Sequence, residues 1–410
     1  MVLNPGPGMS TIAVLGTLDT KGEEHAYVAE CIRKRGHDAL LIDVGSLGEP
    51  QIAPDITRDE VAAAGGVDLT ELSAKNDRGA SVAAMSRSAP HLLLDLLKSG
   101  RISGVISLGG GGGTSIATGA MRALPIGFPK VMVSTLAAGN VEPYVGTKDI
   151  VMIPSVVDVA GLNRISRKVF TQAAGAVCGM VEADIEEGEG RPIIVASQFG
   201  NTTACVDEAR RILEERGFEV LVFHATGAGG RSMESIIESG LVAGVLDITT
   251  TEWADEVLGG MLSAGPDRLG AAARLGVPAI ISPGCLDMAN FASLESLPSR
   301  MKGRLLYEHN PNATLVRTSP EEGVVIGQRI AARLNESTGP VTVLLPTRAI
   351  SVIGAKGQPF HDPAADQALF KALRENLRAD IVVKELDLEI NDPVFAASCV
   401  EALLENMGKA

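Results

Sequence analysis

Aromatic residues and basic charge are both scarce in this chain of 410 residues. Phe, Trp and Tyr make up 3% of the sequence, and 36 Lys and Arg face 50 Asp and Glu, for a formal net charge of −14. Single-stranded nucleic acids are usually bound by stacking on aromatic side chains, and phosphates are neutralised by Lys and Arg. The composition therefore argues against nucleic acid as a partner.

Cysteine motifs and long apolar segments are also lacking. No apolar run reaches the ~18 residues that a membrane helix needs, and residues 1–10 lack the features of a signal peptide. Without a C-x-x-C motif, zinc and thioredoxin-like sites are disfavoured. We expect a reduced, cytoplasmic protein with no membrane partner. Its five cysteines are far apart: Cys31, Cys178, Cys205, Cys285 and Cys399.

Apolar residues make up 45% of the chain, and 46 residues are glycine, which is compatible with large cores and many tight turns. Short β-branched segments alternate with helical patterns almost throughout, and this alternation predicts an α/β fold with parallel sheets. The predicted strands include residues 11–15, 38–44, 104–108, 130–134, 193–196, 219–223 and 341–344, and the predicted helices include residues 23–35, 91–98 and 205–216.

The order of elements in the first half recurs in the second. In the first half, a predicted strand and helix are followed by Arg35-Gly36 and a second strand. The same order recurs 181 residues later, with Arg216-Gly217 in the same place. Further along, Ser99-Gly100 matches Ser239-Gly240 at an offset of 140 residues. We predict two Rossmann-like parallel-sheet domains related by this internal repeat, residues 9–188 and 191–410. The cleft between them is the expected ligand site.

The two offsets differ by 41 residues, which places an insertion in the first copy at about residues 45–90. A long insertion in a compact α/β domain is often functional or an interaction element. A tolerated surface loop is the alternative, and the sequence does not decide between the two.

A run of five glycines is the sharpest local feature. Gly109, Gly110, Gly111, Gly112 and Gly113 follow a predicted strand and precede Thr114 and a helical segment. Glycine lets backbone N–H groups approach an anion, and a helix N-terminus adds partial positive charge. The run matches neither the dinucleotide fingerprint nor the P-loop. We predict an anion site here, with Thr114 or Ser115 capping the helix or holding a phosphate oxygen; a simple capping turn is the alternative.

Two other turns of the first copy carry polar side chains where strands end. Thr17 offers a hydroxyl, Asp19 a carboxylate for Mg²⁺ or a ribose hydroxyl, and Lys21 an ammonium for phosphate. Ser134 and Thr135 follow a later strand. Because neighbouring parallel strands end at one edge of a sheet, these turns together predict a nucleotide pocket. Helix capping by Asp19 and a solvated Lys21 is the alternative for the first turn.

Two residues of the second half are catalytic candidates together with Asp19. Cys285 follows a predicted strand at a turn, a position that suits a nucleophile, although a small residue lining the pocket is the more common role. Arg348 lies in a polar loop after the strand at 341–344 and could receive an anionic substrate. An ordinary surface position is equally compatible with the pattern around Arg348.

Three segments resemble one known family: Gly16–Glu23, the Leu108–Thr114 glycine run and Ser282–Asp287. The family comprises the N-terminal region of a plant tobamovirus-resistance protein, an inhibitor of viral RNA replication, and mostly uncharacterised bacterial proteins. The resemblance spans about residues 11–407 and implies two Rossmann-like subdomains, ATP with Mg²⁺ in the first, and a homodimer. The plant protein has a further C-terminal barrel domain and this chain stops before it, so we expect a bacterial metabolic role and not viral inhibition.

We therefore expect an ATP-binding protein, an enzyme that uses ATP and Mg²⁺ on a small anionic metabolite at the inter-domain cleft. A regulatory or scaffold protein that binds ATP without turnover is the alternative, since no familiar kinase or ATPase base motif is present. A dinucleotide oxidoreductase is a weaker third hypothesis. Asp43 ends the second strand, where a ribose-binding acid is typical, but the turn after Gly16 lacks the glycine fingerprint.

Overall fold

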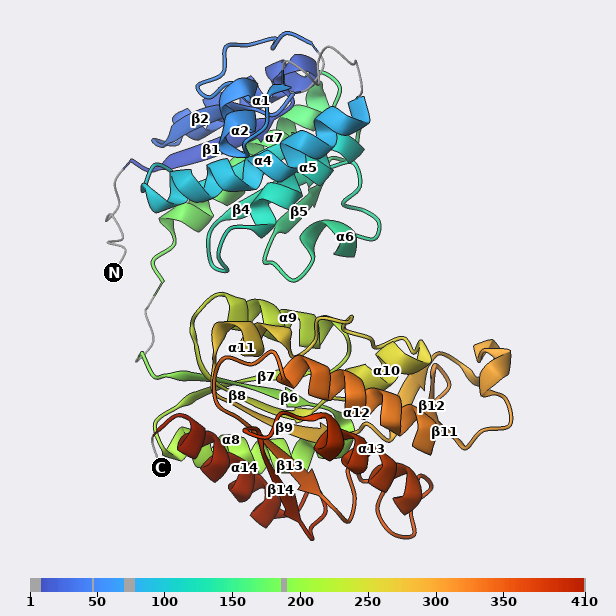
Figure 1. Cartoon of the computed structure of the whole chain (residues 1–410). Coiled ribbons are helices and arrows are strands. Elements are labelled where there is room, and N and C mark those ends of the chain that lie inside the picture. Colours follow the sequence, from blue (N-terminus) through green and yellow to red (C-terminus); the bar gives the residue numbers. More distant parts are fainter. Residues whose placement is uncertain (1–8, 46–47, 70–77, 186–189, 409–410) are drawn as a thin grey trace. The chain divides into compact units, whose positions relative to one another are not determined.

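The computed structural model of the chain describes residues 9–45, 48–69, 78–185 and 190–408. The chain divides into two compact units, Met1–Glu186 and Glu187–Ala410. Each unit is an α/β domain built on its own parallel sheet (Figure 1). The predicted fold class, with two Rossmann-like parallel sheets, is confirmed.

The first unit has a five-stranded parallel sheet in the order β2-β1-β3-β4-β5. Its strands are β1 (Thr11–Gly16), β2 (Asp38–Asp43), β3 (Gly104–Gly109), β4 (Lys130–Ser134) and β5 (Val151–Pro154). Its described helices are α1 (Leu18–Arg33), α2 (Arg58–Ala64), α4 (Arg78–Lys98), α5 (Gly111–Arg122), α6 (Glu142–Val145) and α7 (Arg164–Glu182).

Both faces of this sheet are covered by helices because successive strand residues point to opposite sides. In β1, Ile12 and Val14 pack with α1 and α7, whereas Ala13 and Leu15 pack with α4 and α5 (Figure 1). The continuous apolar strands seen in the sequence are therefore what a parallel sheet between two helical layers requires.

Part of the insertion expected at about residues 45–90 contributes to this core; residues 46–47 and 70–77 lie outside the described residues. Ile56, Val61 and Met85 are buried in the apolar cluster on the α4 side of the sheet. Helix α2 begins with a capping box in which Thr57 accepts from the Glu60 N–H and Glu60 from the Thr57 N–H. The insertion therefore contains both core residues and a surface stretch, because residues 48–55 are exposed or partly exposed.

The second unit has a six-stranded parallel sheet and a small antiparallel one, in the orders β14-β13-β9-β8-β6-β7 and β10-β12-β11. The parallel strands are β6 (Ile193–Gln198), β7 (Glu219–His224), β8 (Val242–Thr249), β9 (Ala279–Gly284), β13 (Val341–Pro346) and β14 (Val382–Leu386). The antiparallel strands are β10 (Met288–Phe291), β11 (Leu306–Asn310) and β12 (Ala313–Arg317).

Helices cover both faces of the large second sheet. Helices α8 and α14 pack on one face and α9, α11 and α12 on the other (Figure 1). The helices are α8 (Thr203–Glu215), α9 (Ala228–Glu238), α10 (Glu252–Leu258), α11 (Gly270–Leu275), α12 (Pro320–Leu334), α13 (Pro363–Asn376) and α14 (Pro393–Asn406), with short 3₁₀ turns at Gly200–Thr202, Leu294–Ser296 and Ser299–Met301.

The two parallel sheets share one strand order. The order β7-β6-β8-β9-β13 repeats β2-β1-β3-β4-β5, and β14 is added at one edge. This shared order agrees with the internal repeat, whereas the antiparallel sheet between β9 and β13 was not predicted. In a sheet of order 2-1-3-4-5, ligands bind at the switch point between the first and third strands.

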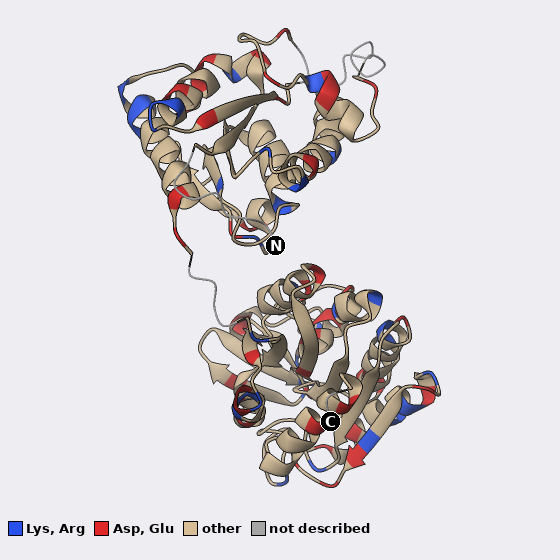
Figure 2. Ribbon diagram, turned by 90° about the vertical axis from the view of Figure 1, so that its left-hand side faces the viewer, with Lys and Arg blue, Asp and Glu red and all other residues tan. Residues whose placement is uncertain are grey.

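Acidic and basic residues are interspersed along the helices of both units (Figure 2). All five cysteines are free thiols; Cys31 is partly exposed and the other four are buried. No helix within the described ranges has the length and apolar character that crossing a membrane requires.

Candidate functional site

A pocket of about 230 Å³ lies at the switch point of the first sheet. One wall is the turn after β1, and the other is the first turn of α5, which follows β3. The structure thus brings together most of the residues that the sequence predicts as ligands on these two turns. The lining residues are Thr17, Asp19, Thr20, Lys21, Val82, Gly110, Gly111, Gly112, Gly113 and Ile116.

The glycine run is itself the start of α5. Gly110 is the N-cap and the helix begins at Gly111, earlier than the sequence predicted. The first hydrogen bond within the helix is donated by Thr114 N to the Gly110 carbonyl oxygen, at 2.9 Å. The N–H groups ahead of Thr114 have no intrahelical acceptor. Together with the helix dipole, they give this end of the pocket the properties of an anion site.

Neither backbone conformation nor packing explains the middle glycines. None of Gly110, Gly111 and Gly112 has a positive φ, and an ideal Cβ at Gly111 or Gly112 would meet no heavy atom within 4 Å. Gly109 differs, because a Cβ there would lie 3.1 Å from the Gly113 Cα. Each helical glycine costs about 0.5–1 kcal/mol relative to alanine. Gly111 and Gly112 therefore lower helix stability without a packing reason within the unit.

A buried histidine joins the two walls of the pocket. His25 Nδ1 lies 2.6 Å from the Lys21 carbonyl oxygen, and Leu108 N donates to His25 Nε2 at 3.4 Å. These contacts require the neutral ring with its proton on Nδ1. Burial lowers the pKa of His25 and so favours this neutral form. Lys21 has non-helical backbone angles, which kink α1 at the pocket.

Asp19 and Lys21 are the charged side chains of this pocket. Asp19 is partly exposed, and its Oδ2 accepts from the Gly48 N–H at 3.3 Å. Lys21 Nζ donates to the Val159 carbonyl oxygen. Mg²⁺ is usually held by one or two carboxylates together with substrate phosphates and water, so Asp19 suits that role. Within the described residues, no three His, Cys, Asp or Glu side chains gather to hold a metal ion by themselves.

Two of the predicted ligands, Thr114 and Ser134, are buried. Their hydroxyl oxygens are 2.7 Å apart, which ties α5 to β4. The prediction that Thr114 caps the helix or holds phosphate is wrong, because Gly110 is the N-cap and Thr114 Oγ1 bonds inside the core. Thr135 is exposed and lines a second pocket. Its N–H donates to the Gly109 carbonyl oxygen at 3.2 Å, beside the glycine run.

Cys285 does not lie at a cleft. It is fully buried and packs against Met288, Leu315 and Phe360. Burial raises the pKa of the Cys285 thiol well above its usual value, and a cysteine attacks as the thiolate. The predictions that Cys285 is a nucleophile or lines a pocket are both wrong, because its side chain belongs to the core.

Arg348 is exposed and pairs with Asp387 on the surface. The guanidinium makes two contacts with the carboxylate, Nε–Oδ1 at 3.0 Å and Nη2–Oδ2 at 2.9 Å. Exposed pairs of this kind contribute about 0–1 kcal/mol. This geometry corresponds to the ordinary surface position that the sequence left open, and not to a substrate receptor.

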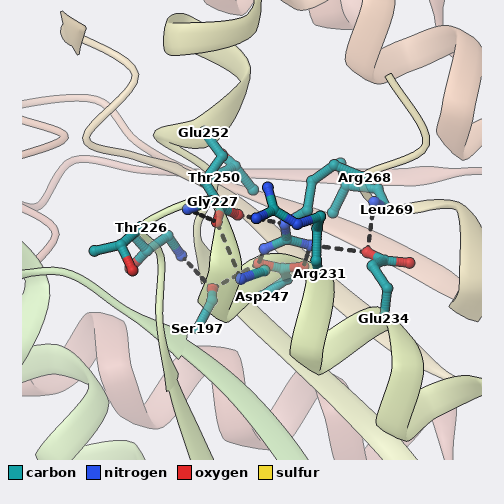
Figure 3. Close-up of polar contacts among 12 residues, drawn as sticks. Ser197, Thr226, Gly227, Arg231, Glu234, Asp247, Thr250, Glu252, Arg268 and Leu269 are labelled. Atoms are coloured by element: carbon teal, nitrogen blue, oxygen red, sulfur yellow. Dashed lines mark hydrogen bonds and ion pairs between the residues drawn. The ribbon is translucent and has the colours of Figure 1, made fainter. Parts of the chain in front are cut away.

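A buried ion cluster lies at the switch point of the second sheet (Figure 3). Arg268 is 1% exposed; its Nη1 and Nη2 donate to the Asp247 carboxylate at 2.5 and 2.7 Å, and its Nε donates to Glu252 at 2.6 Å. Glu234 accepts from Arg268 Nη1 at 3.1 Å. This cluster was not predicted from the sequence, because no motif marks Arg268.

In this cluster, Glu252, the first residue of α10 after β8, caps the start of the neighbouring helix α9. Its Oε1 accepts from Gly227 N at 2.7 Å and Gly230 N at 3.0 Å, at the start of α9. A carboxylate at a helix N-terminus satisfies the same N–H groups as a bound phosphate. The two halves have thus diverged: the first switch point is an open pocket, and the second is filled by the chain's own side chains.

The fold defines a protein of two doubly wound α/β domains. An uncharacterised protein family, UPF0261, matches with its N-terminal domain over residues 10–186 and its C-terminal domain over residues 191–407. The chain belongs to this family. A UPF0261 protein of Clostridium tetani is 48% identical over 400 residues, which cover 97% of this chain and 99% of that protein.

The resemblance to the plant resistance protein is confirmed at the level of the family. The ToMV resistance protein Tm-1(GCR237) of Solanum lycopersicum is 36% identical over 414 residues, which cover 95% of this chain and 55% of that protein. Among solved structures, a UDP-N-acetylglucosamine 2-epimerase from Rickettsia bellii matches with a TM-score of 0.24 and 12% identity, over 66% of this chain and 78% of that one. A likeness this weak assigns no function.

Proposed function

We propose that the first unit binds ATP with Mg²⁺ and that the triphosphate rests on the start of α5. The observation that carries this proposal is the segment Gly110–Gly112, which has no positive φ and no crowding at Gly111 or Gly112, yet faces a pocket. A ligand whose oxygens come close to the backbone accounts for the missing side chains.

The other wall supplies matching chemistry. Asp19 would coordinate Mg²⁺ together with phosphate oxygens, and Lys21 would add positive charge at the pocket's edge. The hydroxyls of Thr17 and Thr20, 3.1 Å apart, offer further donors. In a chain of net charge −14, the cation would also offset the repulsion between Asp19 and the phosphates. The resemblance to an ATP-binding family is our reason for proposing ATP among the nucleotides.

Binding has more support than turnover. Phosphoryl transfer needs an acceptor placed in line with the transferred group, and the two catalytic candidates of the second unit are a core residue, Cys285, and a surface ion pair, Arg348. We therefore put ATP binding first and action on a small anionic metabolite second. Assembly as a homodimer is a separate proposal, which rests on the resemblance and is tested by light scattering at micromolar concentration.

A ligand-stabilisation experiment tests the proposal. A ligand at a hundred times its Kd stabilises a domain by about 2.7 kcal/mol, so ATP with Mg²⁺ should raise the melting temperature of the first unit, whereas NAD and small carboxylates should not. The sole tryptophan, Trp253, lies in α10 of the second unit, so its fluorescence identifies the other transition. A stabilisation by NAD but not by ATP would contradict the proposal.

A further inference from the structure

A second pocket, of about 350 Å³, adjoins the proposed phosphate site. Its walls are the turn after β4, with Ser134, Thr135 and Ala138, and Pro154–Asp158 after β5. An ideal Cβ at Gly110 would lie 3.8 Å from Thr135 Oγ1. Thr135 lines this pocket and Gly110 the first one, so the two pockets meet at the glycine run.

The two pockets differ in charge. Among its described lining residues, the second pocket has one ionisable side chain, the exposed carboxylate of Asp158, and neither Lys nor Arg. The first pocket has Lys21 and the bare helix start beside one carboxylate, Asp19, which the proposed function assigns to Mg²⁺. A triphosphate is therefore favoured in the first pocket and disfavoured in the second. The second pocket suits an uncharged group instead.

A strained and exposed valine stands at the second pocket. Val156 has a φ of 65° and is 77% exposed. The turn around it is closed by Val157 N, which donates to the Ser155 carbonyl oxygen at 2.7 Å, and by Ser155 Oγ, which donates to the Val157 carbonyl oxygen at 2.6 Å. A β-branched residue in this region of φ is a true outlier. Such strain persists mostly at ligand sites, and exposure means that burial does not offset it.

The loop that carries Val156 is anchored to the first pocket. Lys21 Nζ donates to the carbonyl oxygen of Val159, and Gly161 N donates to Glu24 Oε1 at 2.6 Å. Lys21 and Glu24 both belong to α1, the helix that begins beside the first pocket. The loop is therefore fixed relative to the phosphate site, as one ligand spanning both pockets would require.

We propose that the second pocket binds the nucleoside of the nucleotide, with the base packed on Val156 and Pro154 and the ribose hydroxyls donating to Asp158. This rests on the proposed function and deepens it. Apolar side chains are the usual surroundings of a bound base, and an acidic residue commonly accepts from ribose hydroxyls in doubly wound folds.

The variant Val156→Gly separates this proposal from the proposed function. Titration calorimetry with ATP–Mg²⁺ measures the affinity of both pockets together. The same measurement with inorganic tripolyphosphate–Mg²⁺ gives the affinity of the phosphate pocket alone. We expect about tenfold weaker binding of ATP, in line with the loss of a valine contact, and unchanged binding of tripolyphosphate. The unliganded variant should melt no lower than the wild type, because glycine relieves the strained φ. Val151→Ala, an exposed valine on β5 outside the pocket, is the control.

Unchanged ATP affinity in Val156→Gly would overturn the nucleoside pocket and leave the phosphate site standing. An equal loss for ATP and tripolyphosphate would also overturn it, since the substitution would then act on the phosphate pocket. If the wild type binds neither probe, the proposed function itself fails. For the ribose contact, wild type should prefer ATP over 2′-deoxy-ATP, and Asp158→Asn should abolish this preference; a preference that persists would overturn the assignment of Asp158.

Discussion

The imidazole of His25 fills the space that a side chain at Gly16 would need. An ideal Cβ at Gly16 would lie within 3.0 Å of three ring atoms, including Nε2, the atom that accepts from Leu108 N. Gly16 ends β1 just before the turn at Thr17, and Leu108 precedes the glycine run. This close fit sets the spacing between the two walls of the candidate site.

Replacing Gly16 should therefore disturb both stability and binding. In Gly16→Ala the ring must move, and we expect a loss of about 1–3 kcal/mol in the first unit, as is typical of overpacking, with weaker binding of ATP. Calorimetric unfolding measures the loss. Gly179→Ala in α7 is the control, because a Cβ there would meet no atom within 4 Å. A Gly16→Ala protein as stable as this control would contradict the account of His25.

The neutral state of His25 predicts a pH dependence. Burial lowers its pKa below the usual value near 6.5, against the opposing effects of the hydrogen bond to the Lys21 carbonyl and of the charge of Glu24. The unfolded chain therefore takes up the proton first, so the first unit has its full stability above about pH 6.5 and loses stability as the pH falls from there towards the folded pKa. Calorimetry between pH 7.5 and 5 should show this loss, and His25→Gln should reduce it. An identical pH profile in the variant would show that another group titrates.

The second unit should depend on Arg268. In Arg268→Met two buried carboxylates, Asp247 and Glu252, and the partly buried Glu234 lose their cation. We expect a loss of about 3–5 kcal/mol, the usual effect of breaking a buried ion pair. Trp253 fluorescence during urea unfolding follows this unit. Arg274→Met, which breaks an exposed pair with Glu238, should cost no more than about 1 kcal/mol; equal losses would contradict the account.

Thiol labelling should distinguish the cysteines. We expect iodoacetamide to modify the partly exposed Cys31 in the native protein and to leave the buried Cys285 unmodified, as peptide mass spectrometry would show. Cys285→Ala should retain ATP binding, because the first unit holds the candidate site. Rapid modification of Cys285 in the native protein would contradict its burial and make it a candidate nucleophile again.

The strands were predictable because they are apolar on both faces. The strand predicted at residues 130–134 is β4, and that at 104–108 is β3 with one residue added. Helix starts were predicted less well. Helix α1 begins at Leu18, and Thr17 at its N-cap makes no side-chain capping hydrogen bond that would mark the start. Helix α5 begins inside a glycine run that locally favours a loop.

The candidate site was predictable only where local chemistry and strand order suffice. The turns after β1 and β3 are neighbours because these two strands pair, so the proximity of Asp19 to the glycine run could be predicted from the sequence. Burial is a tertiary property, which is why Cys285 was assigned to a cleft. His25 contacts a residue 83 positions away, and Arg268 one 21 positions away, with no motif to link either pair.

The central claim is that the bare start of α5 holds a nucleotide phosphate, and titration calorimetry of ATP–Mg²⁺ with Gly112→Ala and Gly119→Ala tests it most directly. Both substitutions lie in α5 and meet no atom closer than 3.9 Å, so neither should destabilise the helix. Only Gly112 lines the pocket. We predict at least tenfold weaker binding in Gly112→Ala and wild-type binding in Gly119→Ala. Equal affinity in both variants would contradict the account.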